Sequence, residues 1–219
     1  MVEDQSAASN PTQVMLKLTE ADVTSVLCIC DVLSLRDSYM AAASRQGFFP
    51  EWIVSGVIDL DLDNSYHGAP PDQASRVMGV SFRNPVLPRQ EMAWYWAVKE
   101  AAPTKDPTGG TTYSAMARYA QLSVLAAGIQ MAGPRLTPAS FQAGLFKARF
   151  PNPGAGGPPY FQARVGFPGG RHTMTDDATL FWYSPSEPGT VDPEFPGSVC
   201  YVNGGRRYTA STFPADDRD

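Results

Sequence analysis

Acidic side chains at alternate positions are the first candidates for chemistry in this chain of 219 residues. The segment "DLDLDN" places Asp59, Asp61 and Asp63 on one side of the backbone if the segment is extended. Its spacing resembles the start of an EF-hand loop, but Pro70 occupies the position at which such a loop needs a bidentate Glu. We therefore expect no EF-hand. A solvated acidic edge is the favoured interpretation, and a loose cation site is the alternative.

The other residue types that often bind metals or perform catalysis are few and scattered. His67 and His172 are the only histidines, and neither lies near a cysteine or in an H-x-x-x-H spacing. The segment "TDD" at 175–177 follows His172 closely, but the chain has no G-x-S-x-G nucleophile elbow and no P-loop. We therefore predict no catalytic site, no metal site and no cofactor, and we interpret "TDD" as a polar turn before a strand.

The three cysteines do not form a disulfide framework of the kind seen in small secreted domains. Cys28 and Cys30 alternate on one predicted strand, so their side chains face the same side, whereas Cys200 lies far away in the sequence. Buried core thiols are the favoured interpretation. A disulfide between Cys200 and one of the other two, or a role in metal binding or catalysis, remains an alternative.

The composition is that of a soluble globular protein, with 43% hydrophobic and 18% charged residues. The net charge is -5 and the sequence has no run rich in Lys and Arg, so we expect no nucleic-acid partner. It has no apolar stretch of 18 residues, so we expect no membrane span. The N-terminus "MVEDQSAASNPTQ" is polar and acidic, unlike a secretion signal, so the residues alone leave the compartment unknown.

The first part of the chain alternates predicted strands and helices. An unbroken apolar run at 26–30 predicts a strand buried on both faces, and "EWIVS" and "RVMGVSF" predict two more strands. Between the first two strands, apolar residues recur at helical spacing, and Ser34 with Asp37 predicts an N-terminal capping box. Because crossovers between parallel strands are almost always right-handed, this βαβαβ order predicts a parallel, doubly wound α/β layer from about residue 10 to residue 84.

Two further helices are predicted at about 89–102 and 113–132, and the second is followed by a tight corner. Gly133 with Pro134 ends this helix, and Thr137 followed by Pro138 begins the next one. Leu136 and Phe141 have the spacing of a hydrophobic staple across that start. The helix before the corner has few polar side chains, so we expect its apolar side to pack against a segment that this chain does not fully supply. The residues of that side are Leu122, Leu125, Ile129 and Met131.

The C-terminal part predicts long loops and a small β-structure. "PNPGAGGPPY" and "FPGGRH" are loop sequences, and "ATLFWY" predicts a strand. Asn203-Gly204 lies between two β-rich runs and predicts a hairpin turn.

Open α/β sheets bind ligands outside the carboxyl ends of their strands, and this rule selects candidate binding residues without any motif. It selects Asp31 and Ser34 after the first strand, Ser55 and Asp59 after the second, and Arg83 after the third. Each of these residues could instead be a helix cap or a solvated loop residue.

The order of these elements resembles the type I periplasmic binding proteins, and specifically the leucine/isoleucine/valine-binding-protein-like solute receptors of ABC transporters. The resemblance rests on five phrases that cover most of residues 14 to 213: "VTSVLCICD", "YMAAASRQGFFPEWIVSG", "GVSF", "YAQLSVLAAGIQMAGPRLTPASFQAGL" and "HTMTDDATLFWY". It implies two α/β lobes that capture a small solute between them without chemistry, and an extracytoplasmic location. The alternative is a structural or assembly subunit that keeps the fold but has lost its ligand.

The resemblance also implies how the chain divides. Residues 1–13 form a polar segment, 14–104 an α/β lobe, 105–150 a helical pair like part of the other lobe, and 151–219 a loop-rich return with terminal strands. The other lobe's own sheet has no counterpart before residue 14, so we expect a second protein chain that supplies it, or a homo-oligomer.

Two positions depart from the amino-acid receptors of that family. Met78 stands where those receptors carry an acidic side chain for the ligand ammonium, and Val32 or Leu33 stands in place of an aromatic residue after the first strand. These departures argue against an amino acid as the solute.

Overall fold

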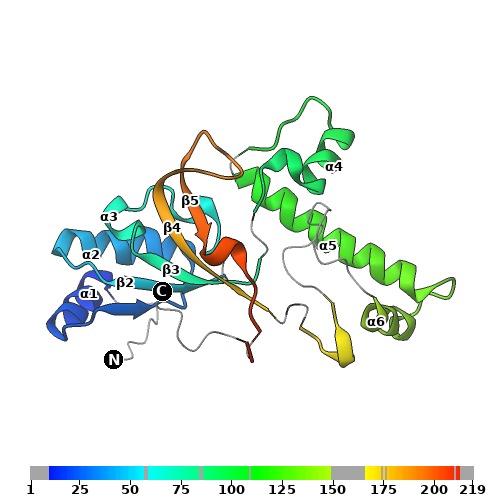
Figure 1. Cartoon of the computed structure of the whole chain (residues 1–219), viewed down its shortest axis with the longest axis horizontal. Coiled ribbons are helices and arrows are strands. Elements are labelled where there is room, and N and C mark those ends of the chain that lie inside the picture. Colours follow the sequence, from blue (N-terminus) through cyan, green and yellow to red (C-terminus); the bar gives the residue numbers. More distant parts are fainter. Residues whose placement is uncertain are drawn as a thin grey trace. The chain divides into compact units, whose positions relative to one another are not determined.

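The computed structural model describes residues 10–56, 59–83, 86–108, 110–148, 166–173, 175, 177–209 and 211–212. The chain forms two compact units, whose helices and strands are labelled in Figure 1. Unit 1 comprises Met1–Ser81, Leu180–Gly189 and Pro193–Gly205, and unit 2 comprises Phe82–Thr179, Thr190–Asp192 and Arg206–Asp219. This division differs from the linear one predicted above, because the C-terminal strands return to the sheet of the first unit.

A five-stranded mixed sheet in the order β1-β2-β3-β4-β5 is the centre of unit 1 (Figure 1). β1 pairs with β2 and β2 with β3 in parallel, and β4 pairs with β5 in antiparallel orientation. The α/β fold class with a C-terminal antiparallel pair is therefore confirmed. The strands are β1 (Ser25–Leu27), β2 (Glu51–Ser55), β3 (Val77–Ser81), β4 (Thr179–Pro188) and β5 (Pro196–Tyr201).

The helices of unit 1 follow the local signals in the sequence. The Asn10 side chain accepts a hydrogen bond from the Thr12 N–H and begins α1, with Pro11 at its first position. Gly47, with φ of 66°, ends α2 in a left-handed conformation that glycine adopts without strain. The helices are α1 (Pro11–Glu20), a π-helical segment (Ser34–Met40) that continues into α2 (Ala41–Gln46), the short 3-10 helix η3 (Asp63–Tyr66) and α3 (Pro71–Ala74).

The core of unit 1 lies between these helices and one face of the sheet. Trp52 on β2 is fully buried, and its indole N–H donates to the Gln73 side-chain oxygen at 2.8 Å. The Gln73 amide N–H donates in turn to the Phe48 carbonyl at 2.8 Å, so this buried polar side chain is satisfied. The cluster draws side chains from all parts of the unit, among them Met15, Leu35, Met40, Val54, Val77, Phe181, Tyr183 and Val199.

Two predictions about strands are wrong. β1 is not buried on both faces, because Leu27 is 63% exposed on the same face of the sheet as the exposed Met78 of β3, and Ile29, just beyond the strand, is 81% exposed. Asn203 and Gly204 do not join two strands of a hairpin. They lie in the 3-10 helix η6 (Val202–Gly205) with φ of 50° and 63°, and the antiparallel pair is formed earlier, by β4 and β5.

The cysteines also differ from the prediction. Cys28 and Cys30 are joined to each other by a disulfide, with 5.4 Å between their Cα atoms. Cys200 is a free, half-buried cysteine, so the predicted disulfide that includes it is wrong. Cys28 lies in the hydrophobic core and Cys30 packs against it, but they form a disulfide, so the favoured interpretation of buried core thiols is wrong for this pair.

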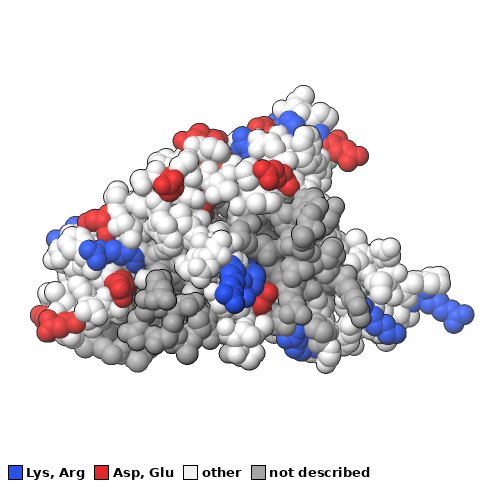
Figure 2. All heavy atoms as spheres, in the orientation of Figure 1, with Lys and Arg blue, Asp and Glu red and all other residues white. Residues whose placement is uncertain are grey.

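Most of the described residues of unit 2 lie in helices. Its helices are η4 (Arg89–Glu91), α4 (Ala93–Ala101), α5 (Gly110–Ala132), α6 (Pro138–Lys147) and η5 (Pro168–Gly170). None of the helices in the described ranges is long and apolar enough to cross a membrane. On the face shown in Figure 2, Lys and Arg side chains are dispersed among Asp and Glu side chains.

The predicted corner between α5 and α6 is confirmed. Gly133 has φ of 73° after α5, and Thr137 forms a capping box with Ser140, in which each side chain hydrogen-bonds the backbone N–H of the other at 3.1 and 2.8 Å. The Phe141 ring lies against Gly128 of α5, where a side chain would clash with it. The predicted staple between Leu136 and Phe141 stays a prediction. The four apolar residues of α5 named above are between 45% and 63% exposed.

Candidate functional site

Polar residues collect at the carboxyl ends of the three parallel strands of unit 1. Asp31 and Ser34 follow β1, Ser55 ends β2, and Ser81 ends β3. Because neighbouring parallel strands end at the same side of a sheet, these residues share one edge, where α/β folds bind ligands. The buried Asp61, from the loop after β2, joins them through Ser81.

Asp31 and Ser34 contact each other directly. The Ser34 backbone N–H donates to Asp31 Oδ1 at 3.0 Å, and its hydroxyl donates to Asp31 Oδ2 at 2.5 Å. The prediction of Ser34 as N-cap is therefore wrong: Asp31 caps this helix, three residues earlier, since its carbonyl also accepts from the Leu35 N–H. The bonds that the Ser34 hydroxyl and backbone N–H donate lower the pKa of Asp31, which stays ionised and exposed at neutral pH.

The two candidates after β2 occupy different surroundings. Ser55 is the last residue of β2 and is half-buried at the carboxyl end of that strand. Asp59 is exposed and has φ of 58°, a left-handed conformation that Asp tolerates better than most residues. Its carbonyl accepts a 2.5 Å hydrogen bond from the Ser65 hydroxyl, which fixes the loop that carries it.

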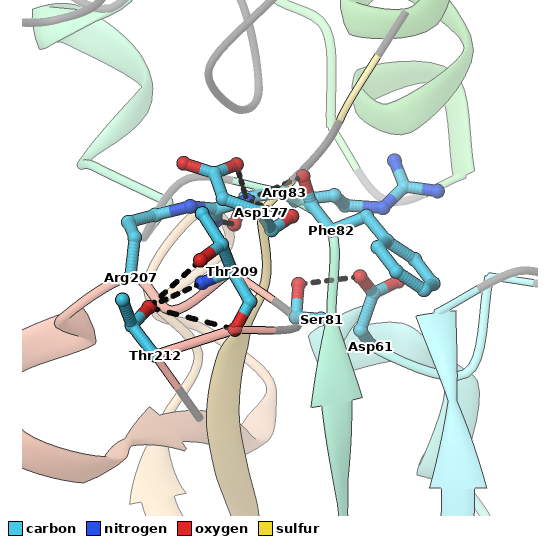
Figure 3. Close-up of polar contacts among 8 residues, drawn as sticks. All are labelled: Asp61, Ser81, Phe82, Arg83, Asp177, Arg207, Thr209 and Thr212. Atoms are coloured by element: carbon cyan, nitrogen blue, oxygen red, sulfur yellow. Dashed lines mark hydrogen bonds and ion pairs between the residues drawn. The ribbon is translucent and has the colours of Figure 1, made fainter. Parts of the chain in front are cut away.

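Asp61 and Asp63 are buried, so the interpretation of this segment as a solvated acidic edge is wrong for both. Asp61 is 0% exposed, and its Oδ2 accepts from the Ser81 hydroxyl at 2.6 Å (Figure 3). The Gly56 backbone lies so close to this carboxylate that a side chain there would clash with it. Asp63 is 6% exposed, and its Oδ1 accepts from the Val199 backbone N–H of β5 at 2.7 Å.

The rule for strand ends did not select Asp61 or Ser81 as ligand-binding residues, and Asp61 was named only as part of a possible cation site. One signal was available: Leu60 and Leu62 alternate with the aspartates, and two leucines inside an acidic loop indicate that it packs inward. Both leucines are indeed buried.

The charge of Asp61 affects its surroundings. The Tyr66 hydroxyl donates to the Leu60 carbonyl at 2.6 Å, and burial, followed by the charge of Asp61, raises the pKa of Tyr66 well above its usual value. The phenol therefore stays neutral, while the nearby carboxylate receives the Ser81 hydrogen bond. A buried carboxylate is unfavourable unless it is well paired, and such groups concentrate at functional sites.

Arg83 belongs to unit 2, just beyond the end of β3, and its backbone takes part in a second polar cluster. The Arg207 guanidinium donates to the carbonyls of Arg83, Phe82 and Asp177, and to the Asp177 carboxylate at 2.8 Å (Figure 3). Each of these segments lies within three residues of a point at which the chain passes between the two units. A single guanidinium therefore holds three crossing segments together within unit 2.

The arrangement at the sheet edge is suited to hydrogen bonding. The exposed carboxylates of Asp31 and Asp59 accept hydrogen bonds and the half-buried Ser55 hydroxyl can donate or accept one, so they can bind a small molecule that carries N–H or O–H donors. Asp61 and Ser81 are buried and bind each other beneath them. Within the described ranges, no group of three or more His, Cys, Asp or Glu side chains could hold a metal ion.

Comparisons with known proteins give a fold but no sequence relative. No family model and no curated protein matches the chain. The structure is similar to a fatty acid ABC transporter substrate-binding protein from Thermomonospora curvata, with a TM-score of 0.56 and 14% identity over 94% of this chain and 48% of that one. It is also similar to an ABC transporter substrate-binding protein from Aeropyrum pernix, with a TM-score of 0.59 and 11% identity over 94% and 49%.

A third similar structure is a type 1 periplasmic binding protein from Bordetella pertussis Tohama I, with a TM-score of 0.54 and 14% identity over 81% of this chain and 48% of that one. At such low identity the likeness shows the fold alone, and that fold agrees with the one implied by the sequence phrases. The chain spans about half the length of each of these three proteins.

Proposed function

We propose that this chain, which has the fold of the type I periplasmic binding proteins, is a solute-binding component that captures a small molecule without chemistry. The observation that carries the proposal is the buried Asp61–Ser81 pair beneath the carboxyl edge of the parallel strands. Folding gains little from a buried carboxyl group, whereas the Asp61–Ser81 bond holds the loop after β2 against the end of β3, at the side of the sheet where α/β folds bind ligands.

The solute that fits this edge carries hydrogen-bond donors. Asp31 and Asp59 present carboxylates on the surface. Ser55 ends β2, the strand between β1 and β3. Met78 cannot accept a hydrogen bond from an ammonium group as an acidic residue would, so we propose a donor-rich solute other than an α-amino acid. Arg83 stays a prediction from the sequence.

A thermal-shift screen tests the proposal. The purified chain is melted with single solutes from a panel of polyols, sugars, amines, amino acids and carboxylic acids. A ligand at about 100 times its Kd stabilises the folded state by about 2.7 kcal/mol, which raises the melting temperature by several degrees. We expect Asp31→Ala and Ser55→Ala to weaken that shift. Glu20→Ala, an exposed site at the end of α1, serves as the matched control and should leave it unchanged.

A structural or assembly role is the second candidate, and one contact favours it. Asp31 and Ser34 hydrogen-bond each other, as a helix cap requires, and a cap needs no ligand. If no solute of the panel shifts the melting temperature, this candidate replaces the first.

We also propose a protein partner, either a second chain that supplies the other lobe or a second copy. Leu27, Ile53 and Met78 lie side by side in register across β1, β2 and β3, and Leu27 and Met78 are largely exposed. Faces of parallel sheets are normally covered, so this apolar row favours a covering partner, as does the exposed side of α5. Light scattering tests this: a stable monomer at tens of micromolar with no dye-accessible apolar surface would contradict it.

The location that the fold favours is extracytoplasmic. One of the similar structures is named a periplasmic binding protein, which supports this proposal. Fractionation of the native cells, with thiols blocked before lysis, tests it. Recovery of the chain with the cytosolic proteins would contradict it.

A further inference from the structure

We propose that Cys28 and Cys30 form a reversible dithiol–disulfide redox site at the carboxyl end of β1, whose reduction lengthens β1 along β2. The site lies at the open edge of the sheet in unit 1, directly before the capping residue Asp31. Its effect on solute binding rests on the proposed function, whereas its redox chemistry does not.

The bond is poorly placed to be a structural staple. A disulfide stabilises a fold mainly by closing a loop in the unfolded chain, and the effect grows with loop length. This disulfide joins residues only two positions apart and encloses Ile29 alone. Such a bond restricts the unfolded chain very little, so its loss leaves the fold of unit 1 intact.

The bond also changes the local backbone. Two residues of a β-strand advance by about 6.6 Å, whereas the Cα atoms of Cys28 and Cys30 are 5.4 Å apart. The bridged segment is therefore too short to be a regular strand. The parallel ladder with β2 accordingly ends at the pair Leu27–Ile53, followed by one further bond from the Cys28 N–H to the Ile53 carbonyl at 2.9 Å.

β2 continues beyond that point through Val54 to Ser55, so it offers a template for two more residues of β1. Once the bridge is opened, Cys28 and Cys30 can extend, and the same ladder would continue with a bond from the Ser55 N–H to the Cys28 carbonyl and then one from the Cys30 N–H to the Ser55 carbonyl. The lengthened strand would displace Asp31, which is the residue after Cys30, by about 1 Å. Reduction would in this way move Asp31, one candidate binding residue, relative to Ser55 at the end of β2.

The chemistry is thiol–disulfide exchange with an external thiol reductant, which supplies two thiols from one dithiol or from two monothiol molecules such as glutathione. A reductant thiolate attacks the sulfur of Cys30, which is half-buried, in preference to that of the buried Cys28. The S–S bond breaks, and Cys28 leaves as a thiolate and takes up a proton. The second reductant thiol then attacks the mixed disulfide and releases Cys30 as a thiol. Two electrons and two protons pass to the chain, and the reductant becomes a disulfide.

Cys200 provides an internal contrast. It is half-buried on β5, and burial, followed by the charges of Glu187 and Asp63, raises the pKa of its thiol. A raised pKa keeps the thiol protonated and slow to react. It should therefore stay reduced while the Cys28–Cys30 pair changes state.

The test uses the full chain in glutathione buffers of increasing oxidised fraction, followed by acid quenching, alkylation and mass spectrometry. Tryptic cleavage leaves Cys28 and Cys30 together in the peptide 18–36, apart from Cys200. We expect the pair to open and close reversibly with unchanged far-UV circular dichroism. Hydrogen exchange of the Cys30 amide should slow about tenfold or more on reduction, as the new ladder bond protects it.

Two variants serve as controls. Cys200→Ser should behave as the wild type in both measurements. The double variant Cys28→Ser with Cys30→Ser should show the slow exchange in every buffer. Three results would overturn the proposal. In the first, the bridge resists excess dithiothreitol until denaturant is added. In the second, the air-oxidised chain has no bridge, and in the third, reduction leaves the hydrogen exchange of the Cys30 amide unchanged. None of these measurements needs a solute, so their failure is distinct from a failure of the proposed function.

Discussion

Replacement of Arg207 by Met tests whether one guanidinium holds the crossing segments of unit 2 together. The change keeps an unbranched side chain but removes every donor to Phe82, Arg83 and Asp177. It leaves the Asp177 carboxylate, which is 6% exposed, without this ion pair, while Arg207 itself is 18% exposed.

The magnitude follows from that burial. Removal of one partner of a buried ion pair costs about 3–5 kcal/mol, because the remaining charge stays desolvated. Since Arg207 retains some solvent contact, we expect a loss near the lower end, about 3 kcal/mol of unfolding free energy. A second variant, Arg207→Met with Asp177→Asn, removes the stranded charge and should lose less than the sum of the two single changes.

Urea unfolding followed by circular dichroism measures these losses. Arg206→Met is the matched control, since Arg206 is exposed and its guanidinium lies 5.5 Å from the centre of the Tyr208 ring, an interaction of about 0.5–1 kcal/mol. Equal, small losses for Arg206→Met and Arg207→Met would refute the reasoning, and so would full additivity in the double variant.

Three further predictions concern local features. Thr137→Ala should lower the free energy of unfolding by about 1 kcal/mol because the N-cap is lost, and Phe141→Ala should lower it by about 3 kcal/mol because the ring packs on α5. Equal effects in denaturant melts would show that the corner is not packed. Gly79→Ala should lower the melting temperature, at a cost of about 1–3 kcal/mol, because its Cβ would overlap the Val54 carbonyl; an unchanged melt would contradict the close approach of β2 and β3. Since hydrogen bonds lower the folded-state pKa of Asp31, its contribution is present above about pH 4 and is lost as the pH falls through the lowered value. Asp31→Asn should thus be less stable than wild type at pH 7, and the difference should shrink in acid; a difference independent of pH would refute this.

Features that depend on a few neighbouring residues were predictable from the sequence. Asn10 with Pro11, and Thr137 with Pro138, specify helix starts through contacts within one turn, and the structure has both. The parallel order of β1, β2 and β3 followed from the alternation of strands and helices, because few topologies satisfy it.

Features that depend on distant segments were not predictable. Burial of Asp63 relies on the Val199 N–H, which lies 136 residues away, and no local pattern announces that partner. The apolar run of β1 was interpreted as buried on both faces, but burial depends on which segments cover each face of the sheet, and Leu27 and Met78 are exposed on the same face. At the cap of the next helix, Asp31 and Ser34 are both good N-cap residues, so only the backbone geometry distinguishes them.

The central claim is that a small solute binds at the carboxyl edge formed by β1, β2 and β3. Amide NMR of the 15N-labelled chain, titrated with the solute that gives the largest thermal shift, tests it most directly. The account predicts saturable changes in chemical shift that are largest at residues 31–34, 55–56 and 81. It also predicts that the Ser55→Ala variant shows smaller or weaker-binding shift changes with the same solute. Changes confined to α5 and α6, or no saturable change with any solute of the panel, would contradict it.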